Sequence, residues 1–188
     1  MRLLPLDTPG LVDLVSKWLA RKENYQWLDF GNGRQIVTPA LIRIMAQREG
    51  HFLRVYTWGR DDLPIGIVGL NNLDRAFKTG TLWAVAGERS FSNRGYVSLA
   101  SSKLLTLAFR DLGLHAVDTW IVDRNPSLRS LGRLNFRFIG RKRQCHYIEG
   151  RPYDRLLFDL LATEHRELDE ERWRRMERRH REAVCEAP

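Results

Sequence analysis

A glycine at position 95 separates two kinds of hydrophobic pattern. Runs rich in β-branched and aromatic residues precede it and predict three strands, at 51–58, 64–73 and 80–87. After the glycine, apolar residues recur at helical spacing up to residue 112, and a strand pattern follows at 115–122. A hairpin followed by a strand–helix–strand crossover needs a sheet covered by helices. The sequence therefore predicts a mixed α/β fold.

The rest of the chain adds flanking helices and a charged tail. Apolar spacing predicts helices at 11–19, 39–48 and 127–136 and a last strand at 151–161. We therefore expect one domain over residues 1–162.

From 163 to 188, acids and arginines recur four residues apart, which predicts a charged helical extension. Its narrow apolar stripe fits either packing on its own domain or a contact in a homodimer.

Composition limits the class of protein. With 43% hydrophobic residues, a chain of 188 residues can bury a core of its own. The start has no secretory pattern and no apolar run is long enough to span a membrane, so we expect a cytoplasmic protein without membrane contact. The two cysteines and five histidines follow no metal-ligand spacing, so neither a disulfide framework nor a metal is expected.

The net charge of +8 is unevenly distributed, because arginines and lysines gather between 124 and 155. Such a stretch favours an anionic neighbour, which composition alone does not identify. Nucleic acid, an acidic protein surface, a phosphorylated cofactor and a merely solvated basic face all stay open.

The polar turn before the central helix predicts an anion site. Gly95 stands after a strand and at the helix start, so backbone N–H groups of Asn93 to Val97 can point outward at the positive end of the helix dipole. Because glycine has no Cβ, a diphosphate can approach the main chain, and Arg94 can add charge at the rim. The turn matches neither GxGxxG nor GxxxxGK[ST], so a dinucleotide fold or P-loop is not predicted.

Several motifs in order resemble the Gcn5-related N-acetyltransferases (GNAT), within them the RimJ/RimL-type branch that acetylates ribosomal-protein N-termini. The resemblance covers about residues 1–162. The motifs that carry it are Asn93-Arg94-Gly95-Tyr96-Val97, Leu112-Gly113-Leu114-His115-Ala116-Val117, Asn125 to Arg129, Leu134-Asn135-Phe136 and Gly150-Arg151-Pro152-Tyr153-Asp154. The chain departs from the family pattern at Ser92, Asn93 and Val97.

The resemblance implies a central, mostly antiparallel twisted sheet and acetyl-CoA as co-substrate. It places cofactor contacts at Val85, Ala86, Ser92, Asn93, Arg94, Gly95, Tyr96, Val97, Asn125 and Arg129. The main chain near Val85 and Ala86 would meet the oxyanion. It also implies that a neutral primary amine attacks the thioester directly, with no covalent enzyme intermediate.

Such a reaction needs a base for the amine and an acid for the leaving thiolate. The position where many relatives carry the acidic tyrosine is Leu131 here, so Ser127 is the candidate acid. Glu88 and His146 are the candidate bases, and an unperturbed histidine titrates near 6.5.

The acceptor side is predicted from the resemblance at Trp27, Asp29 and Phe30. Protein N-termini, amino sugars and other small amines all present the required group, and one carboxylate does not choose between them.

The alternative function is a non-catalytic nucleic-acid or ribosome-binding module. It would use the basic 124–155 stretch with four stacking aromatics, Trp120, Phe136, Phe138 and Tyr147. Since these aromatics alternate with apolar residues, they fit buried strands better than an exposed stacking surface. Nucleic acid is therefore not the expected partner.

Overall fold

The computed structural model describes residues 1–30, 37–92, 94–171, 173 and 175. The strands within these residues are β1 (Leu3–Pro5), β2 (Phe52–Trp58), β3 (Leu63–Asp74), β4 (Thr79–Ala86), β5 (Ala116–Val122), β6 (Arg137–Ile148) and β7 (Arg151–Leu161). The helices are α1 (Pro9–Leu19), α2 (Lys22–Tyr25), α3 (Pro39–Gln47), the short 3-10 helix η2 (Arg89–Phe91), α4 (Tyr96–Arg110) and α5 (Leu128–Arg133). No helix in this described part is long and apolar enough to cross a membrane.

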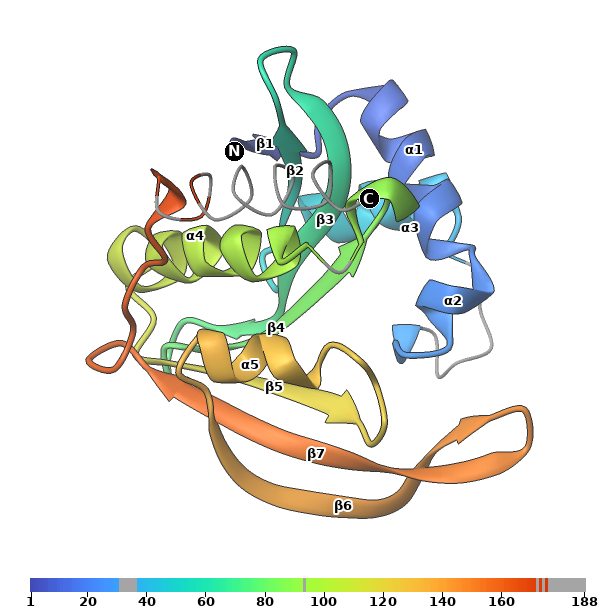
Figure 1. The fold of residues 1–188 in the computed structure, drawn as a ribbon, viewed down its shortest axis with the longest axis vertical. Coiled ribbons are helices and arrows are strands. Elements are labelled where there is room, and N and C mark those ends of the chain that lie inside the picture. The colour runs from blue at the N-terminus through green and yellow to red at the C-terminus, as the bar shows by residue number, and fades with distance from the viewer. Residues whose placement is uncertain (31–36, 93, 172, 174, 176–188) are drawn as a thin grey trace, which may run out of the picture.

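The described strands form one seven-stranded sheet in the order β1-β2-β3-β4-β5-β7-β6. All neighbours are antiparallel except β4 and β5, which run parallel because α4 carries the chain back between them. Figure 1 shows α4 and α5 over one part of the sheet and α1 to α3 at the other side. This architecture confirms the predicted mixed α/β fold with a mostly antiparallel sheet.

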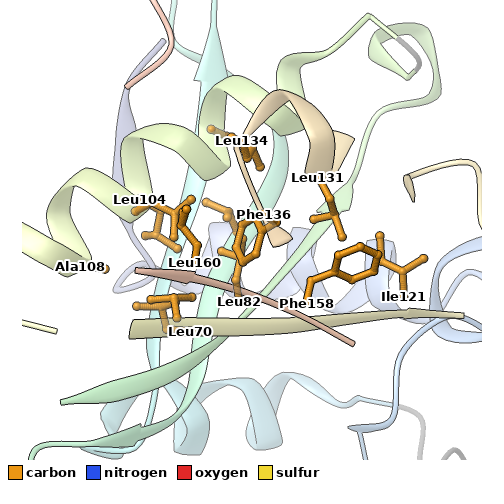
Figure 2. Packing of buried hydrophobic residues seen from close by; sticks show 14 of the residues in the cluster. Leu70, Leu82, Leu104, Ala108, Ile121, Leu131, Leu134, Phe136, Phe158 and Leu160 are labelled. Carbon is orange, nitrogen blue, oxygen red and sulfur yellow. The ribbon is translucent and has the colours of Figure 1, made fainter. Parts of the chain in front are cut away.

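Two hydrophobic clusters hold the helices against the sheet. The larger joins α4 and α5 to β3, β4, β5 and β7, and Figure 2 shows Leu82, Leu104, Phe136, Phe158 and Leu160 meeting in it. The smaller packs α1 and α3 against β2, β3 and β4. Truncating a buried leucine in such a core to alanine costs about 2–5 kcal/mol.

Local sequence explains where the main helices begin. Pro9 and Pro39 stand in the first turns of α1 and α3, where a missing N–H is tolerated. The Thr38 Oγ1 accepts the N–H of Leu41 at 3.3 Å and caps α3. Helix α4 begins differently, because its N-cap is Gly95 in the left-handed region with φ 79°. That backbone shape favours glycine and leaves the helix entrance without a capping side chain.

Four elements are not predicted by the sequence patterns. The patterns give no strand at β1, no helix at α2 or η2 and no full strand at β6, whose residues 137–148 are predicted mainly as a basic stretch. Most residues of β6 are exposed, because it is the outer strand of the sheet, so it has no apolar alternation to detect. Phe138 and Tyr147 on this strand are exposed, whereas the expectation placed them in buried strands.

The parallel pair β4–β5 separates soon after it begins. Its register runs only from Thr79 opposite Ala116 to Thr81 opposite Asp118. One step further, the Thr119 Oγ1 donates to the Leu82 carbonyl at 2.8 Å, so a side chain bridges the widening gap. The sheet opens beyond this point and leaves room for a ligand between the two strands.

Candidate active site

A cavity of about 150 Å³ lies where β4 and β5 separate. Segment 27–30, β3, β4, β5, the first half of α4 and the α5 region contribute its walls. The aromatic and polar lining residues are Trp27, Asp29, Phe30, Asn71, Asn72, Thr81, Trp83, Ser101, Thr119, Trp120, Ser127 and Ser130. Asp29 is the one charged side chain among the described residues that line it.

The entrance of α4 has the shape expected of an anion cradle. With Gly95 at φ 79°, the chain turns into the helix without a capping hydrogen bond from a side chain. The Oγ of Ser98, in that first turn, is buried and has no hydrogen-bond partner among the described residues. The backbone here therefore fits a diphosphate.

A side chain of the tail lies against this cradle. A Cβ atom built on Gly95 would overlap the ring of Trp173 and would lie 3.2 Å from Nη1 of Arg133. The Arg133 guanidinium carbon is 5.7 Å from the centroid of that ring, within cation–π range. The space that a diphosphate would take at Gly95 is therefore filled by the chain itself.

The other residues predicted around the turn take several positions. Val97 lines the cavity, and Arg94 is exposed. The Tyr96 side chain is buried, with its ring centroid 4.7 Å from that of Trp58, so only its main chain can face a ligand. The Ser92 N–H donates to the Arg89 carbonyl at 3.0 Å. Asn93 lies outside the described residues.

The predicted cofactor residues on β4 and beside α5 already have local partners. The Val85 carbonyl accepts the Tyr56 hydroxyl at 3.2 Å, and Ala86 pairs with Gly66 of β3. The Asn125 Oδ1 accepts the Ser127 N–H at 2.8 Å, which shapes the start of α5. Arg129 is exposed on the same helix.

The predicted acceptor residues all lie on one wall of the cavity. Trp27, Asp29 and Phe30 come from the segment after α2. The Phe30 ring stands edge-on to Trp83 of β4, with 4.8 Å between centroids. Trp83 is itself fixed, because its Nε1–H donates to Asn71 Oδ1 at 2.9 Å. The structure therefore brings the three predicted residues to one wall.

The three predicted catalytic side chains are not all at the cavity. Ser127 lines it, and its hydroxyl makes no capping bond to α5. Glu88 and His146 are not among the lining residues. The Glu88 carboxylate accepts the Trp18 Nε1–H at 2.8 Å, on the face of the sheet where α1 packs.

Both ring nitrogens of His146 are engaged. One lies 2.7 Å from the Gln26 carbonyl and the other 3.1 Å from Nη2 of Arg155. A carbonyl requires a donor and a guanidinium requires an acceptor, which describes a neutral imidazole. Burial lowers the pKa of His146, and the Arg155 charge acts in the same direction. This residue joins the segment before the acceptor wall to β6.

Sequence reasoning missed several residues of the site. Asn71, Trp83 and Ser101 come from elements that were predicted, yet nothing in one strand shows which residues face a neighbouring opening. Arg155 was counted only as part of the basic stretch, and Trp173 only as part of an apolar stripe of the tail. Asp29, which pairs with Arg155, and Gly95, which Trp173 covers, are each more than 70 residues away from them in sequence, so no local spacing could have found these contacts.

A splayed sheet, an anion cradle and an aromatic cavity at one opening define a group-transfer enzyme that holds an anionic carrier beside a small acceptor. Residues 2–137 match the family described as the acetyltransferase (GNAT) domain. Because this match covers more than half of the chain, the protein belongs to the GNAT acetyltransferases. The resemblance predicted from the motifs is confirmed at this level.

Individual relatives agree with the family. The chain is 27% identical over 175 residues to "Putative ribosomal N-acetyltransferase YdaF" of Bacillus subtilis (strain 168), covering 87% of this chain and 91% of that protein. Among solved structures, the spermidine N-acetyltransferase of Vibrio cholerae in complex with CoA and spermine matches with a TM-score of 0.74 at 15% identity, covering 87% and 96% of the two chains. The ribosomal-protein-S5-alanine acetyltransferase of Vibrio fischeri matches with a TM-score of 0.70 at 19% identity, covering 88% and 93%. These structural likenesses show the fold.

Proposed function

We propose that this acetyltransferase uses acetyl-CoA to acetylate the α-amino group at the N-terminus of a peptide or protein. The observation that carries the proposal is the charge of the cavity. Asp29 is the one charged residue among its described lining residues, and its carboxylate already accepts Nη1–H of Arg155 at 2.9 Å. An aromatic cavity whose single carboxylate is paired with an arginine favours an acceptor with little net charge.

The acidity of the acceptor supports the same choice. An α-amino group has a pKa of about 7.7–8.0, whereas a lysine-type amine has one of about 10.4. At pH 7.4 about a quarter of the former is neutral and nucleophilic, against about one part in a thousand of the latter. A polyamine also brings several cations that would each need a carboxylate. The cavity fits the α-amino group better.

The donor side is held mainly by backbone. Acetyl-CoA supplies the acyl group as a thioester, and the amides at Gly95 and in the first turn of α4 would bind its diphosphate. Val85 and Ala86 lie at the end of β4, directly after the lining residues 81–84, and a main-chain amide there would stabilise charge on the thioester oxygen. Arg94, Asn125 and Arg129 are the further predicted contacts to phosphates or polar groups of the cofactor.

The transfer requires two proton movements. As the C–N bond forms and the C–S bond breaks, the amine loses a proton and the departing sulfur gains one. Ser127 is the proposed donor to sulfur, since it lines the cavity without serving as a helix cap. Glu88 and His146 remain the predicted bases; one Glu88 oxygen accepts from Trp18, and His146 would have to release its contact with Arg155 before its Nδ1 could accept a proton. An α-amino acceptor needs little help from either.

Names of relatives supply independent support. The relative from Bacillus subtilis and the Vibrio fischeri neighbour are both named for acetylation of ribosomal proteins. The Vibrio cholerae neighbours are named for spermidine, a polyamine. The comparisons give no support to the nucleic-acid alternative. The acceptor chemistry of the cavity agrees with the first group of names.

A panel of acceptors tests the proposal. The purified protein is supplied with acetyl-CoA, and thiol release is followed with peptides that carry a free N-terminus, the same peptides blocked at the N-terminus, and spermidine. We expect kcat/KM for the free peptides to exceed that for the other two by at least about tenfold. A higher value for spermidine or for the blocked peptides would contradict the proposal.

A further inference from the structure

Arg155 of β7 links the acceptor wall to the outer hairpin. Its guanidinium carbon lies 3.8 Å above the centroid of Trp120, a residue of the cavity lining. Its Nη1–H donates to Asp29 at 2.9 Å, and its Nη2 lies 3.1 Å from Nδ1 of His146. Only 17% of the Arg155 side chain is exposed. One cation therefore contacts two lining residues and a buried histidine.

The neighbours of Arg155 fix its place. Because one nitrogen of His146 is used by the Gln26 carbonyl, the other can only accept from the guanidinium. The Arg155 Nε is buried and has no hydrogen-bond partner among the described residues, which lowers the stability of the fold. A cation retained at such a cost beside a ligand cavity points to a role in that cavity.

We infer that Arg155 determines acceptor specificity by pairing with the Asp29 carboxylate and offsetting its negative charge. The cavity then rejects polyamines and binds weakly basic α-amino groups. This inference rests on the proposed function and deepens it. A free carboxylate among aromatic walls would attract an ammonium group, both by charge and through cation–π contact. With the Arg155 guanidinium in place, the Asp29 carboxylate is already paired and attracts the ammonium group of a polyamine less strongly.

Four variants separate charge from structure. Arg155→Met removes the cation, Arg155→Lys keeps it, and Arg155→Met combined with Asp29→Asn removes both charges. Arg141→Met is the matched control, because Arg141 pairs with Asp154 at 3.0 Å on the same hairpin but away from the cavity lining. For each protein, kcat/KM is measured with a free-N-terminus peptide and with spermidine, and spermine binding is measured by calorimetry without a donor.

We expect Arg155→Met to raise the spermidine-to-peptide ratio by about tenfold and to tighten spermine binding. The lysine variant, the double variant and the Arg141 control should stay within about threefold of the wild-type ratio. Equal loss on both acceptors with an unchanged ratio would show that Arg155 is only structural and would overturn the inference. A wild-type preference for spermidine would instead overturn the proposed function.

A second observation concerns the tail, which follows α4 towards its N-terminus. His165 lies 2.9 Å from Thr106, the Leu168 N–H donates to Ser102 at 2.8 Å, and Trp173 covers Gly95. Successive residues of the tail therefore contact α4 progressively nearer to its N-terminus, so the tail runs antiparallel to this helix. Further pairs fasten the tail: Glu170 with Lys103 at 3.1 Å and with the Met1 ammonium at 2.6 Å.

The geometry points to an autoinhibitory contact in which the ring of Trp173 excludes the diphosphate of acetyl-CoA. A ring that would overlap a single Cβ at Gly95 leaves no volume for two phosphates there. The cofactor therefore binds only when the ring has left, so its measured Kd is the intrinsic one divided by the open fraction. This observation concerns the donor side and stands apart from the choice of acceptor.

Calorimetry with the full chain tests the contact. Trp173→Ala should lower the Kd for acetyl-CoA by about fivefold, whereas Glu171→Ala, an exposed substitution two residues away, should leave it unchanged. Saturating acetyl-CoA should also speed tryptic cleavage of the wild-type tail, which carries many arginines. An unchanged or higher Kd in Trp173→Ala, or a cleavage rate that acetyl-CoA does not alter, would overturn the contact. Absence of acetyl-CoA binding in every variant would overturn the proposed function as well.

Discussion

The donor side of the site is formed mainly by backbone atoms, whereas the acceptor side is formed by side chains. The cradle at the entrance of α4 depends on one glycine and on backbone amides, whose positions follow from the helix itself. The acceptor cavity depends on side chains from separate elements, held by contacts such as that of Phe30 with Trp83. A backbone site tolerates changes in neighbouring side chains, while a side-chain site changes its ligand when one residue changes. Donor binding and acceptor choice should therefore respond to different substitutions.

Gly95→Glu should give the largest effect of any single substitution. The new side chain fills the cradle and places a carboxylate where a diphosphate binds, so acetyl-CoA binding should weaken by about 100-fold or more. Gly113→Glu is the matched control, since Gly113 also has a positive φ, at 66°, but has nothing within 4 Å of its Cβ position. Calorimetry and thermal melts of both proteins make the measurement. Equal loss of binding in the control would mean that backbone strain alone explains the result.

The same contrast explains what the sequence could predict. The turn at Gly95 and the helix after it could be predicted because a glycine before a helical pattern is local information, and the helix starts within one residue of the prediction. Trp27, Asp29 and Phe30 were predicted to share a wall only through the family resemblance, since no spacing links them to β4. Arg155 and Trp173 were missed because the contact of Arg155 with Asp29 spans 126 residues and that of Trp173 with Gly95 spans 78, so only the folded chain brings them to the site.

Ser127→Ala should lower kcat by about 10- to 100-fold and leave acetyl-CoA binding within about twofold. The proposed reason is that the departing sulfur loses its proton donor, while the cradle keeps its shape. Ser130→Ala provides the control, because Ser130 also lines the cavity from α5. Steady-state kinetics with a free-N-terminus peptide make the comparison. If both serine variants lose the same activity, the donor role does not belong to Ser127.

Phe30→Ala should raise the acceptor KM by about tenfold while the Kd for acetyl-CoA stays the same. The phenyl group buries apolar surface of an acceptor side chain, a contribution of about 1.5–3 kcal/mol when complete. Phe77→Ala is the control, because Phe77 is 78% exposed at the β3–β4 turn. Kinetics in the acceptor and calorimetry in the donor separate the two sides. A parallel loss of donor binding would contradict the separation of the two regions.

The smallest expected effect concerns the link between the hairpin and the acceptor wall. Burial lowers the pKa of His146 below its usual value near 6.5, so between the folded pKa and 6.5 the unfolded chain binds more protons. Stability should therefore fall as the pH drops through 6.5, because the buried ring must stay neutral to accept from Arg155. In His146→Asn this part of the fall disappears, and the decrease in Tm between pH 7.5 and 5.5 should shrink by about 2 °C.

The control for this prediction is His115→Asn, since His115 is exposed on the surface. Burial also lowers the pKa of His165, so part of the acid sensitivity should survive in His146→Asn and disappear when both buried histidines are replaced. The readout is the slope of Tm against pH rather than Tm itself, because losing the Gln26 and Arg155 contacts lowers stability at every pH. An unchanged slope in His146→Asn would show that the pKa of the ring is the same in the folded and unfolded chain, which would contradict a buried neutral ring that accepts from Arg155. His146 would then not hold the Arg155 guanidinium beside Asp29, as the proposed acceptor specificity requires. The pH dependence of stability therefore also tests the proposed choice of acceptor.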